Sequence, residues 1–201
     1  MIRFIVFICG AVVMSFEILG SRVLAPNFGN SIFVWGSLIS VFLAGLSAGY
    51  FLGGRAADIN PSSRKLGLII SAAALLLVTF PLYGIPVCDR VFEQVPGLRS
   101  GPLVASVILF FVPSVFLGAV SPYTARLMIC SLHTSGKTIG SLYALSTLGS
   151  IAGTLLTSFY LITLAGVQTL IVIQGIVLLL VSVPLFFMKL SCRIGRTSGA
   201  E

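Results

Sequence analysis

Glu17 is the residue of this chain whose type and position most clearly predict chemistry, because it lies inside an apolar run from Phe4 to Leu24. A carboxylate in hydrocarbon is costly and normally faces a protein interior or a water-filled cavity. Arg22 follows five residues later, about 140° around a helix, so the two side chains do not share a face. We therefore expect Glu17 to meet another helix, a bound cation or a proton. The alternative is a structural carboxylate held by hydroxyl or backbone donors of neighbouring helices.

Aromatic side chains in other apolar segments could complete a site for a cation. Trp35, Tyr50, Tyr143 and Tyr160 are the candidates, because an ammonium group is attracted to an aromatic face within about 6 Å of the ring centroid. We predict a binding site for a small cationic metabolite, with these candidate substrate-binding residues: Glu17, Arg22, Trp35, Tyr50 and Tyr143.

Other chemistries find little support in the sequence. His133 is the only histidine, and no Asp or Glu lies near it in the sequence to complete a metal or acid–base site. The four cysteines form no CxxC pair, and no strand with a GxGxxG turn can be placed. We expect no metal, no cofactor and no catalytic residue.

The elements that must position Glu17 are membrane-spanning helices. The 201 residues are 57% hydrophobic and 8% charged, with a mean hydropathy of +1.13, which leaves too little polar surface for a soluble globule. A span needs roughly 20 apolar helical residues, and the runs are continuous rather than alternating, which favours helices over a barrel. We predict an all-α polytopic membrane domain over residues 1–190, with six spans at about 4–25, 31–54, 66–86, 102–130, 139–165 and 167–188.

The basic residues predict the orientation of these spans. Lys and Arg are retained on the cytoplasmic side. With both termini inside, three basic residues lie outside, Arg22, Arg90 and Arg99, and nine lie inside: Arg3, Arg55, Arg64, Lys65, Arg126, Lys137, Lys189, Arg193 and Arg196. We expect a protein of the cell (inner) membrane with a cytoplasmic tail at 191–201. The charge of +7 reads as a topology signal, and we expect the lipid bilayer rather than nucleic acid as a partner.

Small residues predict where helices approach closely. Gly45, Gly49 and Gly53 recur every four residues, and Gly149 and Gly153 repeat this spacing in a later span. Such strips let another backbone come near. We therefore expect both helices to be central in the bundle.

Prolines predict an irregular fourth span. Pro113 and Pro122 bracket Gly118, and proline removes a backbone donor and bends or breaks a helix. We expect this helix to be kinked or to end early, with the portion from Ser121 to Tyr123 lining something polar or emerging at the inner surface. Whether a kink at Pro122 acts as a gate or only adapts the helix to its neighbours stays open.

Four runs of sequence carry a resemblance to a known family. They are EILGSRVLAPNFGNS at 17–31, GLSAGYFLGGRAAD at 45–58, LGAVSPYTARL at 117–127 and GKTIGSLYALSTLGSIAGT at 136–154. In this order, with Trp35 between the first two, they resemble the transmembrane part of the membrane-bound spermidine synthase-like proteins. The resemblance covers nearly the whole chain.

In that family the helices commonly precede a cytoplasmic aminopropyltransferase domain that uses decarboxylated S-adenosylmethionine and putrescine. This chain stops at Glu201, shortly after the last span, so we expect it not to be an enzyme by itself. The resemblance leaves two functions open. One is binding or transport of a polyamine or related cation. The other is a scaffold that anchors a separate aminopropyltransferase through basic residues of the inner loops: Arg55, Arg64 and Arg126.

A broader similarity concerns residues 54–65, which resemble the inner loop between helices two and three of major facilitator transporters. Arg55 and Asp58 are three apart and can meet on one helical face. Transporters of that superfamily have two six-helix halves. Because this chain supplies one half, we expect a homodimer to build a complete pathway.

Overall fold

The computed structural model describes residues 1–59, 61–95, 97–128 and 135–187. Its elements are α1 (Ile2–Phe28), α2 (Ile32–Asp58), α3 (Ser63–Gln94), α4 (Ser100–Met128), α5 (Ser135–Leu156), the π-helix η2 (Thr157–Leu161), α6 (Ile162–Leu164) and α7 (Val167–Phe187). Over these residues six helices are long and apolar enough to cross a membrane, one of them formed by α5, η2 and α6 together. The predicted all-α polytopic membrane fold is confirmed.

The helix ends differ most from the prediction at the end of α3, which continues to Gln94 rather than ending near residue 86. Pro81 and Pro86 lie inside this helix, which resumes after each because a proline removes only one backbone donor. Cys88 and Val91 beyond them are buried in the core, so burial of their side chains stabilises the additional helical turns. The predicted tail at 191–201 lies outside the described residues, as do His133, Lys189, Arg193 and Arg196.

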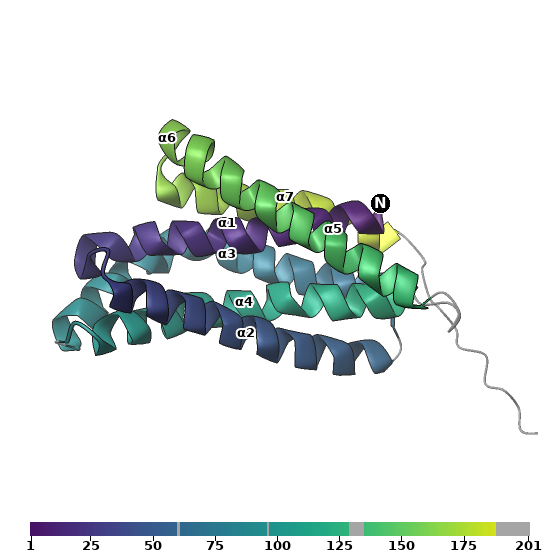
Figure 1. The fold of residues 1–201 in the computed structure, drawn as a ribbon, viewed down its shortest axis with the longest axis horizontal. Coiled ribbons are helices and arrows are strands. Elements are labelled where there is room, and N and C mark those ends of the chain that lie inside the picture. The colour runs from purple at the N-terminus through teal and green to yellow at the C-terminus, as the bar shows by residue number, and fades with distance from the viewer. Residues whose placement is uncertain (60, 96, 129–134, 188–201) are drawn as a thin grey trace, which may run out of the picture.

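The helices run up and down and pack mainly in pairs, α2 with α4, α3 with α7 and α1 with α5. Helix α1 lies between these pairs and contacts each of the other long helices (Figure 1). In Figure 1, α5 crosses α1 obliquely and moves away from α2 along its length. Helix α1 therefore has one face toward α3 and α7 and another toward the space between α2 and α5.

An aromatic cluster fills the centre of the bundle. The ring of Phe16 lies 5.6 Å from Phe42, 5.8 Å from Phe80 and 5.3 Å from Phe110, in each case edge to face. All four side chains are buried. Aromatic pairs at this spacing add to the free energy gained by burial, so the cluster fixes α1, α2, α3 and α4 to one another.

The glycine strips make the close contacts that their spacing predicts. A methyl group on Gly49 would overlap the backbone of α4 at Val115, and one on Gly153 would overlap the backbone of α1 at Ala11. The expectation that α5 is central is wrong, however, because α5 is the least buried of the six spans, whereas α2 is buried to the same extent as α7. The glycines occupy one face only, while large apolar residues such as Phe51 and Leu148 are exposed on the others.

Helix α4 is continuous from Ser100 to Met128, with Pro113 and Pro122 inside it. The expectation that it ends early is therefore wrong. Pro113 is buried, and Gly118 packs against the backbone of α2 at Leu46. Neighbouring helices hold α4 together across both prolines.

A polar network joins three spans where the π-helix begins. The Ser15 and Thr157 hydroxyls share a hydrogen bond, and Gln174 Nε2 donates to Ser15 Oγ at 2.5 Å. The Ile162 N–H reaches back five residues to the Thr157 carbonyl, the pattern of a π-helix. This network fixes α5 and α7 to α1 on the side of α1 away from α2.

Candidate functional site

A polar groove lies where α1, α2, α4 and α5 meet. We call it the serine groove, and it has a volume of about 160 Å³. Its lining residues are Cys9, Gly10, Val13, Met14, Leu46, Tyr50, Leu117, Gly118, Ser121, Ser146 and Ser150. The Ser150 hydroxyl donates to the Gly10 carbonyl at 3.2 Å, which fixes α5 along one side. Each of the four helices contributes at least two of these residues.

Glu17 continues the stripe of α1 that lines the serine groove. Gly10, Val13 and Met14 lie seven, four and three residues before it, so all four share one helical face. One turn further along, Gly20 lies against Leu38 of α2 and Phe110 of α4. The Glu17 side chain is partly exposed, and no described residue forms a hydrogen bond or ion pair with it. Its carboxylate therefore has free capacity for a ligand.

Tyr50 lies at the other part of the same groove, and Tyr143 lines an adjoining crevice. Tyr50 lines the groove from α2, and Tyr143 lies close enough to Tyr50 for the two side chains to interact electrostatically. The crevice is narrow and shares Ser121 with the groove. Three of the five candidate substrate-binding residues, Glu17, Tyr50 and Tyr143, thus belong to one face of the bundle.

The structure separates Arg22 and Trp35 from this group. Arg22 lines a different groove, between α1, α3 and the beginning of α7. Trp35 is exposed near the start of α2, about 22 Å along the helix from Tyr50. Their assignment to the same site is wrong. A five-residue step turns Arg22 away from Glu17, and Trp35 is too far along its helix.

Hydroxyl groups that the sequence did not single out as site residues surround the groove. Ser146 and Ser150 line it beside the glycine strip of α5, and Ser121 lines it from α4. The expectation that the portion around Ser121 lines something polar agrees with this position. The signal that could have found the other two is the run of small polar residues on the face of α5 that meets α1.

Among the described residues, three buried hydroxyls of α4 have no hydrogen-bond partner, those of Ser106, Ser114 and Thr124. Ser114 lies one turn before Leu117, and Thr124 lies one turn after Ser121, so they share the helical face of these groove residues. Ser114 also lies against Gly45 of α2. A buried hydroxyl without a partner costs about 1–3 kcal/mol. Ser114 and Thr124 are fully buried and do not line the groove, so a ligand there would meet the serine hydroxyls of its lining instead.

The residues predicted to shape the inner loop pair differently from the prediction. Arg126 Nε of α4 donates to Asp58 Oδ1 of α2 at 3.2 Å, and the Arg55 guanidinium lies 5.3 Å from the centre of the Phe51 ring. The pairing of Arg55 with Asp58 is therefore wrong, because α4 brings a closer cation. The ion pair ties α2 to α4 just beyond Gly53.

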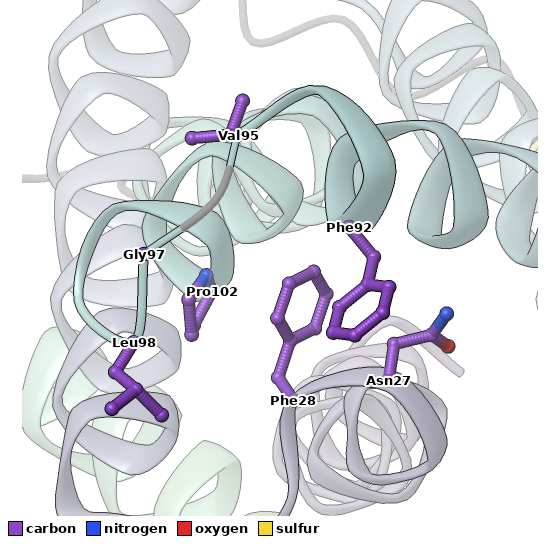
Figure 2. A pocket seen from close by; sticks show the side chains of 7 residues that line it. All are labelled: Asn27, Phe28, Phe92, Val95, Gly97, Leu98 and Pro102. Atoms are coloured by element: carbon purple, nitrogen blue, oxygen red, sulfur yellow. The ribbon is translucent and has the colours of Figure 1, made fainter.

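A second pocket lies at the opposite end of the bundle, between the ends of α1 and α3 and the start of α4 (Figure 2). The Phe28 and Phe92 rings pack edge to face there, with centroids 5.9 Å apart, and Asn27 Nδ2 donates to Asp89 Oδ1 at 2.9 Å. Its volume is about 250 Å³ and most of its lining is apolar. It contains none of the candidate site residues.

Comparisons with protein-family models, with curated proteins and with solved structures give no match to this chain. The geometry of the serine groove and the sequence itself are therefore the basis for a function.

Proposed function

We propose that this membrane protein binds a small cationic metabolite in the serine groove and moves it across the bilayer. The observation that carries the proposal is Glu17, a carboxylate in the middle of a span that faces the groove and has no partner among the described residues. Such a group is stabilised by a cation. A polyamine or a related compound is the substrate class that the resemblance to the spermidine synthase-like proteins suggests.

The aromatic pair supports the same ligand chemistry. A polyamine carries ammonium groups separated by apolar carbon chains. Glu17 would hold one ammonium group, while Tyr50 and Tyr143 would offer ring faces to a second one further along the groove. The apolar groove residues between them, such as Met14 and Leu46, suit the carbon chain.

We further propose that two copies of the chain form the complete pathway. The serine groove holds about 160 Å³, which is less than the roughly 300–1,000 Å³ of typical small-molecule sites. It is bordered by α2 and α5, which pack mainly on α4 and on α1. A second copy facing this side would enclose Glu17 and enlarge the site.

The proposed topology follows the basic residues. Both termini lie in the cytoplasm, so the ends of α2 and α4 with Arg126 and Asp58 face inward and Glu17 lies beyond the midplane. The proposal assigns no reaction to the chain.

The test is uptake and binding of labelled spermidine by the purified protein in liposomes. The expected result is saturable uptake by the wild type and its loss in Glu17→Gln, because the amide keeps the shape but not the charge. Glu93→Gln is the matched control, since Glu93 is exposed near the end of α3. Neither uptake nor binding by the wild type, or equal activity of Glu17→Gln and the wild type, would overturn the proposal.

A further inference from the structure

Arg22 lies in a groove of its own, which we call the Arg22 groove. Its volume is about 380 Å³, within the range of about 300–1,000 Å³ for ligand sites. Its lining residues are Arg22, Val23, Pro26, Phe80, Ile85, Gly166, Val167, Gln168 and Thr169. They come from α1, α3, the turn at Gly166 and the first three residues of α7.

The Arg22 groove has two chemically different parts. Arg22, Gln168 and Thr169 present a guanidinium, an amide and a hydroxyl, while Val23, Phe80 and the other lining residues are apolar. Arg22 is exposed, and no described residue pairs with its guanidinium. The groove thus offers positive charge and hydrogen-bond donors directly beside an apolar surface.

The position of the groove matches this division. Gly166 lies in the turn between two spans, where the chain reverses at the membrane boundary. Arg22 lies six residues before the end of α1, so its long side chain reaches the same level. Lipid phosphates lie at this boundary and acyl chains lie below them.

We propose that the Arg22 groove binds one anionic phospholipid. Its phosphate accepts hydrogen bonds from the Arg22 guanidinium, which matches a phosphate with two parallel donors. The Thr169 hydroxyl and the Gln168 amide add neutral donors, and an acyl chain lies along Phe80 and Ile85. This site is separate from the serine groove and does not depend on transport.

The experiment is native mass spectrometry of the full chain in mild detergent with added phosphatidylglycerol. We expect the wild type to bind one lipid tightly. The affinity of Arg22→Gln for this lipid is expected to be about tenfold weaker, as for loss of one charge-assisted hydrogen bond. Arg22→Lys keeps the charge and is expected to lie between them. Arg90→Gln is the matched control, since Arg90 is exposed outside this groove.

Two further ligands identify what the groove recognises. Diacylglycerol with the same acyl chains is expected to bind weakly, because it lacks the phosphate, and inorganic phosphate at the same concentration is expected not to displace the lipid. Equal lipid binding by Arg22→Gln and Arg90→Gln would overturn the proposal. Diacylglycerol binding as tight as phosphatidylglycerol, or displacement by inorganic phosphate, would also overturn it.

Discussion

Helix α1 separates two regions of opposite character, and neighbouring residues face one each. Phe16 points into the aromatic cluster and is fully buried, whereas Glu17 lies on the face of the serine groove and is partly exposed. The cluster fills its space with rings, while the groove is lined by small residues and hydroxyls. The comparison teaches that tight packing on one face of α1 can fix the helix while another face borders a groove with polar groups.

The largest effect on stability is expected in the aromatic cluster. Phe16→Ala removes a ring that touches three others, and the free energy of unfolding is expected to fall by about 3–5 kcal/mol. Leu75→Ala is the control, since Leu75 is 59% exposed toward lipid on α3 and its removal leaves no cavity. Unfolding in mixed micelles measures both, and equal losses for the two variants would contradict the assignment of the cluster as the core.

The second-largest effect on stability is expected at the glycine contacts that border the serine groove. Gly153→Ala places a methyl group against the backbone of α1, and we expect a loss of about 1–3 kcal/mol as α5 moves outward. Gly140→Ala on the same helix meets open space and is expected to stabilise the helix by about 0.5–1 kcal/mol. Thermal unfolding in detergent distinguishes them, and the same sign for both would count against close packing of α5 on α1.

The polar network of Ser15, Thr157 and Gln174 is expected to contribute less. Thr157→Val keeps the shape and removes the hydroxyl, at an expected cost of about 1 kcal/mol. Thr147→Val is the matched control, because the Thr147 hydroxyl is exposed and bonds to Tyr143 O in its own helix. A stability change no larger than that of the control would show that the network does not hold α5 in place.

The smallest effect is expected at the ion pair of Asp58 and Arg126. Both side chains are partly exposed, at 70% and 35%, so solvent screens their attraction. A double-mutant cycle with Asp58→Asn and Arg126→Gln is expected to give a coupling of about 0.5 kcal/mol that decreases with added salt. A coupling above about 2 kcal/mol, unaffected by salt, would mean that the pair is shielded from water.

The sequence predicts most of the fold because span length and hydropathy depend on local composition. Gly49 and Gly153 also predict close contacts, since a residue without a side chain lets another helix backbone approach, whichever helix that is. Their spacing cannot tell which neighbour they meet or whether the helix is central. The end of α3 was missed because Cys88 and Val91 are held by tertiary packing.

The candidate site was predictable only in part. Glu17 was singled out because a carboxylate is rare in a span, and Tyr50 and Tyr143 because aromatic rings suit a cation; their role in binding stays a prediction. Arg22 was kept as a candidate although its position about 140° from Glu17 already put it on another helical face, and the structure places it in a different groove. The partner of Asp58 was missed because Arg126 is distant in the sequence.

The most direct test of the account asks whether water reaches residue 17 through the serine groove. In a protein whose native cysteines are replaced, Glu17→Cys is treated with a charged thiol reagent that does not cross the membrane, and labelling is compared with that of Leu75→Cys. The account predicts labelling at 17 and no labelling at the lipid-facing position 75. No labelling at 17, or equal labelling at both positions, would contradict it.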